Sequence, residues 1–330
     1  MATPRRRVVI LGGAGFIGSH LCDHFLAQGS VVVCVDNYLT GAARNIAHLL
    51  GRPDFEHIET DISEGLAVEG DVDAVLHFAS PASPADYRRF PIETLRAGSL
   101  GTFNALALSQ AKNARFVLAS TSEVYGDPQV HPQAEAYWGN VNPVGPRSCY
   151  DEAKRFAEAL TWSYARQHQL STCIIRIFNT FGPRMRAGDG RVIPNFIDQA
   201  LSDRPLTIAG DGTQTRSFCY VDDLVDGVSK ATAADIAGPV NLGNPVEHTV
   251  RELADLVRAQ IVSDAAIAYY PLPQDDPQIR CPDISRARRQ LGWSPAVTLA
   301  EGLRRTIEWT LTAEDSVQRE SQQVPSSGRH

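Results

Sequence analysis

The stretch RVVILGGAGFIG at residues 7–18 decides the fold, because an apolar run leads directly into a glycine-rich turn. The turn places Gly12, Gly15 and Gly18 in a GxxGxxG spacing, and a helical pattern follows it. Glycines at this spacing permit a tight turn and let backbone N–H groups at a helix N-terminus approach a pyrophosphate. A glycine triplet alone could equally be an ordinary strand-to-helix turn, so other features must support a dinucleotide site.

Outward from this turn, short apolar runs alternate with helical patterns. The predicted strands are Arg7–Leu11, Val31–Val35, Phe55–Glu59, Ala74–His77, Phe116–Ala119 and Thr172–Ile177, and the predicted helices include Phe16–Gln28, Thr94–Lys112 and Tyr150–His168. This alternation is typical of a parallel sheet with helices on both faces. We therefore expect an α/β protein, a Rossmann-type doubly wound parallel sheet with a smaller C-terminal lobe.

The expected division has three parts. Residues 1–180 form the nucleotide-binding domain that also carries the catalytic residues, and residues 181–312 form mainly the smaller lobe, with some segments returning to the first domain. The polar segment 313–330 is expected to be a disordered tail.

Composition narrows the possible functions of the 330 residues. With 43% hydrophobic and 21% charged residues, the chain is typical of a globular enzyme. A net charge of −7 argues against nucleic-acid binding. The N-terminal apolar run stops after four residues, so we expect no signal peptide and no membrane anchor. Six cysteines without a CxxC pair or a close Cys/His spacing favour no metal site and a reducing, cytoplasmic location.

Acidic residues after the second and third strands support the dinucleotide site. Asp36 ends the run VVVCVD, 18 residues after Gly18. Its carboxylate can accept hydrogen bonds from both ribose hydroxyls and would repel a 2′-phosphate, which favours NAD over NADP. Asp61 and Ile62 follow the third strand, where they would meet the adenine, although Asp61 could also be a simple turn carboxylate.

Tyr150 and Lys154 lie four residues apart on one predicted helix, hence on one face. A phenol is a poor base at neutral pH, and a nearby ammonium is expected to lower the pKa of Tyr150. The spacing alone would fit a half-buried tyrosine beside a solvated lysine. Ser120, Thr121 and Ser122 end the fifth strand, where a hydroxyl can bond the substrate oxygen that Tyr150 deprotonates.

Together these features resemble the extended short-chain dehydrogenase/reductases, which act on nucleotide sugars. Within that family the chain resembles the UDP-glucuronate decarboxylases, also called UDP-xylose synthases, from about Val8 to Trp309. The resemblance is carried by HFASPASPADY (77–87), LASTSEVYGDP (118–128), NVNPVGPRSCYDEAKR (140–155), RIFNTFGPRM (176–185), DGRVIPNF (189–196), QTRSFCYVDDLV (214–225), NLGNP (241–245) and QDDPQIRCPDI (274–284).

The resemblance implies an NAD-dependent homodimer that converts UDP-glucuronate to UDP-xylose. The reaction would oxidise C4, release CO2 from the 4-keto acid, protonate C5 and re-reduce C4. The implied catalytic residues are Tyr150, Lys154, Thr121, Ser122, Glu123 and Arg280. The implied cofactor residues are Gly12, Gly15, Phe16, Ile17, Gly18, Asp36, Asn37, Thr40, Asp61, Ile62, Phe78, Ser80, Tyr150 and Lys154. The implied substrate residues are Ala82, Tyr87, Glu123, Arg147, Asn179, Arg191 and Arg216.

Some alternatives stay open at the level of sequence. Glu123 could be a mere strand-end carboxylate, Arg280 a surface ion pair, and Arg191 a solvated charge. Ser122 argues against a 4,6-dehydratase, which needs an acid there, and Glu123 argues against a 4-epimerase, which needs no carboxylate there. An enzyme that releases the 4-keto pentose with NADH, and a non-catalytic dinucleotide sensor on the same fold, remain possible functions.

Overall fold

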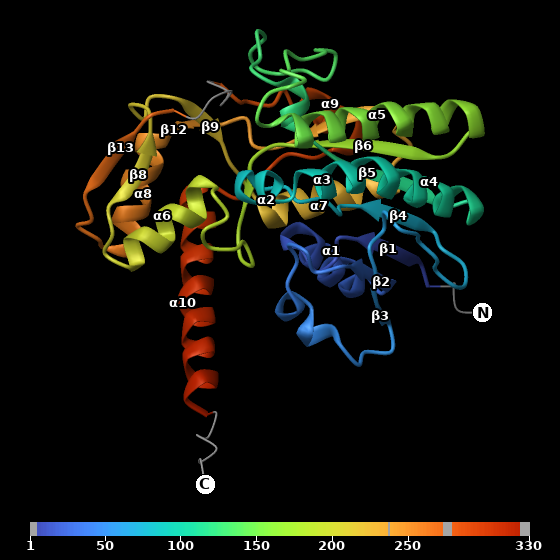
Figure 1. Cartoon of the computed structure of the whole chain (residues 1–330), viewed down its shortest axis with the longest axis horizontal. Helices are drawn as coiled ribbons and strands as arrows, with labels where there is room; N and C mark the ends of the chain where they lie inside the picture. Colours follow the sequence, from blue (N-terminus) through green and yellow to red (C-terminus); the bar gives the residue numbers. More distant parts are fainter. Residues whose placement is uncertain (1–4, 237, 273–278, 324–330) are drawn as a thin grey trace.

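A parallel sheet of seven strands, in the order β11-β6-β5-β4-β1-β2-β3, forms the centre of the structure (Figure 1). The computed structural model describes residues 5–236, 238–272 and 279–323, with side chains described as far as residue 312. The sheet strands are β1 (Arg7–Leu11), β2 (Val31–Asp36), β3 (Phe55–Glu59), β4 (Ala74–His77), β5 (Arg115–Thr121), β6 (Thr172–Ile177) and β11 (Pro239–Leu242). This is the Rossmann strand order with one added edge strand, which confirms the predicted fold class.

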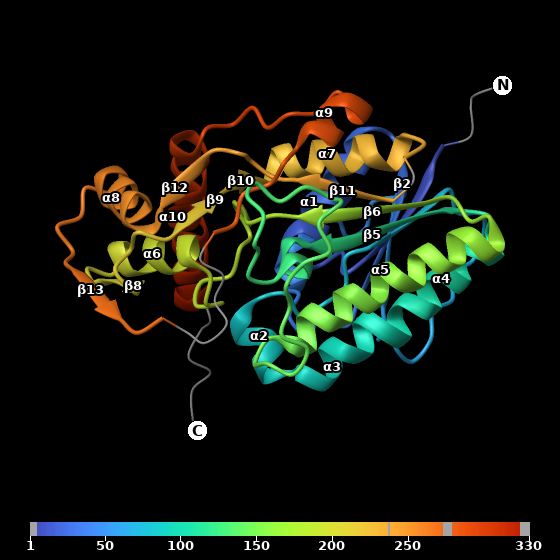
Figure 2. The same cartoon turned by 90° about the horizontal axis from the view of Figure 1, so that it is seen from above.

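Helices cover both faces of the sheet, as Figure 2 shows. One face carries α1 (Phe16–Ala27) and α7 (Val221–Ala233), and the other carries α3 (Pro91–Arg96), η3 (Ala97–Gly101), α4 (Thr102–Ala111) and α5 (Ser148–His168). Successive strand residues point to opposite faces, so Val8 and Ile10 pack in one core and Val9 and Leu11 in the other. Both cores exclude water, which explains why these strands are apolar throughout.

The helix predicted at Thr94–Lys112 is not regular. It consists of α3 and α4 joined by η3, which is a π-helical segment. Gly98 of η3 faces α5, where an added Cβ would lie 2.6 Å from the Cβ of Ala153. The π-helical segment η3 therefore lies at a close contact with α5.

The smaller lobe lies beside the carboxyl ends of the strands (Figure 1). It is built from α6 (Val192–Leu201), α8 (Val250–Ile261), the parallel pair β8 (Leu206–Ala209) and β13 (Ile267–Tyr270), and the antiparallel pair β9 (Thr215–Ser217) and β12 (Glu247–Thr249). The remaining elements are α2 (Pro84–Arg89), η1 (Ala43–Asn45), η2 (Ala47–Leu49), η4 (Ser122–Tyr125), β7 (Thr180–Phe181), β10 (Cys219–Tyr220), α9 (Ser285–Leu291) and α10 (Leu299–Gln323). Because α7 and β11 belong to the sheet layer, residues after 180 do contribute to both parts, while the boundaries at 180 and 312 remain predictions.

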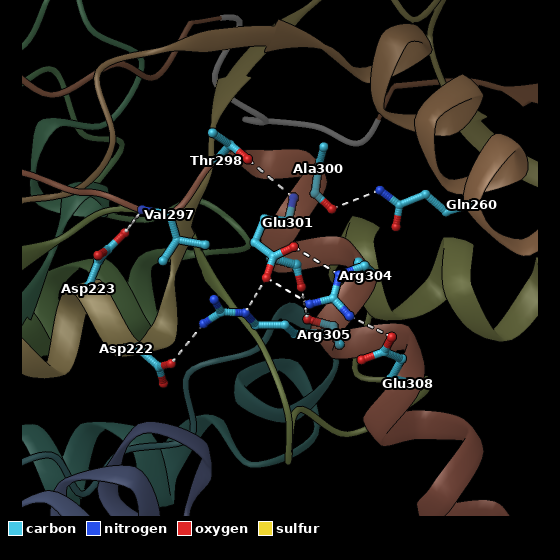
Figure 3. Close-up of polar contacts among 12 residues, drawn as sticks. Asp222, Asp223, Gln260, Val297, Thr298, Ala300, Glu301, Arg304, Arg305 and Glu308 are labelled. Carbon is cyan, nitrogen blue, oxygen red and sulfur yellow. Dashed lines mark hydrogen bonds and ion pairs between the residues drawn. The ribbon is translucent and has the colours of Figure 1, made fainter.

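Helix α10 is anchored to both parts of the molecule at its N-terminal end (Figure 3). The Val297 N–H just before it donates to the Asp223 carboxylate on α7 at 2.9 Å, and Gln260 of α8 donates to the Ala300 carbonyl at 2.8 Å. The helix continues to Gln323, through the first part of the segment expected to be disordered, and 324–330 lie outside the described residues. Among the described helices, none is long and apolar enough to cross a membrane.

Candidate active site

A cleft of about 830 Å³ separates the carboxyl ends of the strands from the smaller lobe. A recess of about 80 Å³ adjoins it and shares the glycine turn and Ser80 with it. Parallel α/β sheets bind ligands at this edge, because the loops that follow the strands meet there.

The predicted site residues all line one of these two hollows. The cleft contains Thr121, Ser122, Glu123, Tyr150, Lys154 and Arg280 of the catalytic set, and Ala82, Tyr87, Arg147, Asn179, Arg191 and Arg216 of the substrate set. It also contains Gly12, Gly15, Phe16, Ile17, Gly18, Thr40, Phe78 and Ser80, while Asp36, Asn37, Asp61 and Ile62 line the recess. Their individual roles remain proposals.

The glycine turn is tightly closed by its own backbone. Gly12 has a positive φ of 80°, and its N–H donates to the Val35 carbonyl at 2.7 Å. A Cβ on Gly18 would lie 2.0 Å from the Gly12 carbonyl oxygen, so no side chain fits there. Gly15 is the N-cap of α1 and makes no side-chain capping bond. The helix therefore presents backbone N–H groups to the cleft, the arrangement that binds a pyrophosphate.

Asp36 lies at the far end of β2, largely buried, with its carboxylate held by the backbone. Oδ2 accepts from the Ala14 N–H at 2.9 Å and Oδ1 from the Tyr38 N–H at 2.8 Å. Burial raises the pKa of Asp36, and these two N–H groups offset part of that rise. Nearby, Asp61 accepts from the Ser63 N–H at 2.8 Å and from the Asn37 amide at 3.3 Å. Asp61 thus forms the turn contact that the sequence allowed, and it also faces the recess.

These features fit NAD. The absence of a Cβ at Gly18 lets the turn close tightly, the α1 N-terminus provides N–H donors, and Asp36 stands at the edge of the connected recess. A carboxylate at that position can bind ribose hydroxyls and repels an added phosphate.

Tyr150, Thr121 and Lys154 come together at the floor of the cleft. The Tyr150 hydroxyl is hydrogen-bonded to Thr121, at the end of β5. Lys154, one helical turn after Tyr150, donates from Nζ to the Ala119 carbonyl at 2.8 Å and lies 5.8 Å from the centre of the Tyr150 ring. Tyr87 stacks on Tyr150 with ring centres 5.3 Å apart, which holds the phenol in place.

The pKa of Tyr150 differs from the expectation drawn from the Tyr-x-x-x-Lys spacing. Burial raises it above its ordinary value, and the negative charges of Glu123 and Asp151 add to the rise, whereas the bond to Thr121 lowers it. Burial also lowers the pKa of Lys154 to about 8. In the protein alone, lost hydration therefore dominates the pKa of Tyr150, and its lowering by Lys154 stays a prediction.

A buried charge cluster of Glu123, Arg147 and Arg280 lies beside Tyr150. Arg280 donates to both carboxylate oxygens of Glu123, at 2.6 and 2.8 Å, and Arg147 donates to Oε2 at 2.5 Å. Burial opposes ionisation of Glu123, but the two guanidinium groups outweigh it and lower the pKa of Glu123 to about 2. Arg280 is therefore not a surface ion pair, and Glu123 is an ionised carboxylate that cannot itself supply a proton.

The remaining predicted substrate residues lie farther along the cleft. Arg191 makes paired contacts with Asp189, at 2.7 Å from Nε and 2.5 Å from Nη2, and it is half-buried rather than fully solvated. Arg216 is buried and donates to its neighbour's carbonyl at Thr215. Asn179 follows β6, where its backbone carbonyl accepts from the Cys219 N–H at 2.9 Å. The cleft thus has a cationic wall suited to a diphosphate.

Sequence reasoning did not single out three polar residues near the site. Arg184 and Arg186 line the cleft, and the available signal for both was the end of the stretch RIFNTFGPRMR, where two arginines follow Gly182-Pro183. Asp151 lies behind Tyr150 with one carboxylate oxygen buried and unpartnered. Burial, followed by the charge of Glu123, raises the pKa of Asp151 to about 7. No sequence pattern signals such an environment, because it depends on packing.

Comparison with known proteins agrees with this geometry. The profile of the NAD dependent epimerase/dehydratase family matches residues 8–243. UDP-glucuronic acid decarboxylase 1 of Danio rerio is 52% identical over 305 residues, which cover 92% of this chain and 72% of that protein. UDP-glucuronic acid decarboxylase 6 of Arabidopsis thaliana is 52% identical over 298 residues, which cover 90% of this chain and 86% of that protein.

Solved structures show the same architecture. UDP-glucuronic acid 4-epimerase from Bacillus cereus, in complex with UDP-glucuronic acid and NAD, has a TM-score of 0.83 at 28% identity, over 93% of this chain and 99% of that one. UDP-glucose 4-epimerase from Thermotoga maritima has a TM-score of 0.84 at 27% identity, over 93% of this chain and 99% of that one.

Proposed function

Because the chain belongs to the NAD dependent epimerase/dehydratase family, and to the branch that contains the UDP-glucuronic acid decarboxylases, we propose that it converts UDP-glucuronate to UDP-xylose and CO2. The observation that carries this proposal is the cluster of Glu123, Arg147 and Arg280 in the same cleft as Tyr150 and Thr121. A C4 epimerisation needs the tyrosine and the hydroxyl, but it needs no carboxylate at residue 123.

The first and last steps depend on Tyr150. The phenolate takes the proton of the C4 hydroxyl, and Thr121, already bonded to the phenol, holds the same oxygen. NAD, when bound, accepts the C4 hydride and later returns it, and its positive ring charge favours the phenolate form of a neighbouring phenol. At the end of the cycle Tyr150 gives the proton back to the C4 oxygen.

Loss of CO2 follows from the C4 ketone, which is β to the carboxylate on C5. The C–C bond breaks, CO2 leaves, and the electron pair is delocalised as an enolate, which then takes a proton from solvent at C5. In this proposal Arg280 aligns the substrate carboxylate, but a tight ion pair with it would stabilise the ground state and oppose the step. The existing bond between Arg280 and Glu123 moderates that attraction, because the guanidinium already has an anionic partner.

The test is an incubation of the protein with UDP-glucuronate and a catalytic amount of NAD, followed by NMR of the sugar and absorbance of reduced nicotinamide. We expect UDP-xylose to form far beyond the NAD supplied, with no lasting NADH, and Tyr150→Phe to abolish turnover. NADH that accumulates with a 4-keto pentose would contradict the closed cycle. UDP-galacturonate as the product would identify a 4-epimerase, and no product at all would overturn the proposal.

The proposed assembly is a homodimer formed through α4 and α5. These helices lie side by side on one flank (Figure 2), and Phe103, Phe156 and Trp162 on them are partly exposed, with Trp162 50% accessible. Apolar side chains gathered on one helical face are typical of an interface. Light scattering should give the mass of a dimer for the wild-type protein and of a monomer for Trp162→Asp. A wild-type monomer at micromolar concentration would contradict this assembly.

The proposed location is the cytoplasm. All six cysteines are free thiols in the structure, and five of them are buried. Free thiols are typical of a reducing compartment.

A further inference from the structure

Three side chains with ligand atoms for a metal meet outside the cleft, although they are far apart in the sequence. His131 lies in the loop after η4, Glu247 begins β12, and Cys281 directly follows Arg280. One imidazole nitrogen, one carboxylate oxygen and the thiol sulfur all lie within 4.8 Å of one another. His131 Nε2 and Glu247 Oε2 are 3.0 Å apart.

The backbone holds these three segments against each other. Gln133 and Cys281 are joined twice, from the Gln133 N–H to the Cys281 carbonyl and from the Cys281 N–H to the Gln133 side-chain oxygen, each at 2.8 Å. β12 pairs with β9, which places Glu247 opposite Ser217. The Ser217 hydroxyl in turn donates to the Arg280 carbonyl at 3.2 Å. The cluster is thus part of a bonded framework and not a chance encounter of mobile side chains.

The carboxylate of Glu247 is already oriented for a ligand. Its Oε1 accepts from the Thr215 hydroxyl at 2.7 Å, which leaves Oε2 toward His131. Ligating carboxylates are usually oriented by such a second hydrogen bond.

The donor set and its surroundings suit zinc or a similar ion. One thiolate, one imidazole and one carboxylate are ligands that zinc accepts in tetrahedral sites, where ligand atoms lie about 3.3–3.6 Å apart. Closing the widest separation requires side-chain movement of about 1 Å. The side chains of His131 and Glu247 are 41% and 28% exposed, so an ion and a water molecule can enter from that side, while Cys281 closes the buried side.

We propose that His131, Glu247 and Cys281 bind one zinc-class divalent transition metal ion, with water as the fourth ligand. Binding releases the thiol proton to solvent and involves no change of oxidation state. The ion joins the loop at 131–133, the start of β12 and the segment that carries Arg280. This proposal replaces the expectation of no metal site, which rested on the absence of closely spaced Cys and His residues in the sequence.

The test is a Co2+ titration of the full chain, without a polyhistidine tag and after treatment with a chelator. Co2+ held by a thiolate has a charge-transfer absorption in the near ultraviolet, so we expect this band to saturate at one ion per chain and to disappear when Zn2+ is added. Cys281→Ser should abolish the band. His131→Gln, Glu247→Gln and Thr215→Val should each weaken binding about tenfold or more.

Two matched variants control for unspecific binding. Cys149→Ser removes a half-buried thiol that donates to the Tyr87 carbonyl, and His48→Gln removes an exposed imidazole paired with Asp23. Both should leave the band and the affinity unchanged. The proposal is overturned if the wild-type protein shows no thiolate band, if the band survives in Cys281→Ser, or if His131→Gln binds as tightly as the wild type. Because His131 is exposed, its variant remains decisive even if Cys281→Ser fails to fold.

Discussion

The glycine turn at residues 12–18 and the cluster of Glu123, Arg147 and Arg280 face the same cleft, but they are built in opposite ways. The turn is one contiguous stretch in which glycines at 12, 15 and 18 leave the backbone uncovered by side chains. The cluster brings together charges that are 24 and 157 residues apart in the sequence. The glycine turn therefore depends on positions that have no Cβ, whereas the cluster depends on contacts between distant segments. Substitutions in the two regions should impair the protein in different ways.

The largest effect on activity is expected from Gly18→Ala. The new Cβ would lie 2.0 Å from the Gly12 carbonyl oxygen, so the turn must open, with a loss of about 1–3 kcal/mol in unfolding free energy. Displaced N–H groups should abolish detectable NAD binding in calorimetry, and turnover with it. Gly292→Ala is the control for the clash, because an added Cβ at Gly292 meets nothing within 4 Å, and its only penalty is the backbone strain of an alanine at a φ of +58°. Normal NAD binding by Gly18→Ala would show that the turn tolerates a side chain.

Glu123→Gln is expected to reduce the rate of CO2 release about 10²-fold while NAD affinity stays at the wild-type value, because the neutral amide no longer holds Arg147 and Arg280 in position. The variant leaves two buried guanidinium groups without their anion, so it should also lose about 3–5 kcal/mol of stability.

Arg280→Lys keeps the positive charge of the cluster but not the two parallel bonds to Glu123. We expect it to retain more stability than Glu123→Gln, measured by urea unfolding. If Glu123→Gln released CO2 at the wild-type rate, the cluster would be structural only.

A smaller effect is expected from Asp36→Asn. The amide keeps an oxygen for one of the two backbone N–H donors, so the fold should persist. Without the negative charge, a 2′-phosphate is no longer repelled, and the preference for NAD over NADP should fall about tenfold. Steady-state rates with each cofactor measure this ratio, and an unchanged ratio would assign the preference to another residue.

The smallest effect is a pH dependence at Asp151. Because its pKa is raised to about 7, ionisation costs stability in the folded state, and that cost grows as pH rises from about 4 to 7. Asp151→Asn should therefore melt at the wild-type temperature near pH 4 and a few degrees higher at pH 8. Asp226→Asn, at an exposed pair with Lys230, should change little at either pH. A gain of Asp151→Asn at pH 4 as large as at pH 8 would exclude this explanation.

Six of the seven sheet strands could be predicted because short strand-like runs alternate with helical patterns, and most of these runs are apolar enough to be buried on both faces. The seventh, β11, could not, because Pro239–Leu242 is short and includes Asn241. That asparagine is fully buried only because its amide is satisfied by the carbonyls of Gln133 and Asp283, at 2.9 and 3.1 Å. Its burial depends on partners far away in the sequence, which no local pattern contains.

For the candidate site, too, the sequence predicted part of what the structure shows. Motif positions indicated many of the residues that line the cleft, though not Arg184 or Arg186, and they did not indicate the state of any side chain. The raised pKa of Tyr150, the ionised Glu123 and the unpartnered oxygen of Asp151 all follow from lost hydration, which only the packed structure defines.

By itself, the sequence determined the features that depend on neighbouring residues: the glycine turn, the alternation of strands and helices, and the positions of Tyr150 and Lys154 on one helical face. Only the tertiary structure decided which charged side chains are buried together and which potential metal ligands lie close to one another. Arg280 meets Glu123, and Cys281 meets His131 and Glu247, because the strand order brings the loops of distant segments to one edge. Local backbone preferences act over a few residues, whereas electrostatic and coordination chemistry act through space.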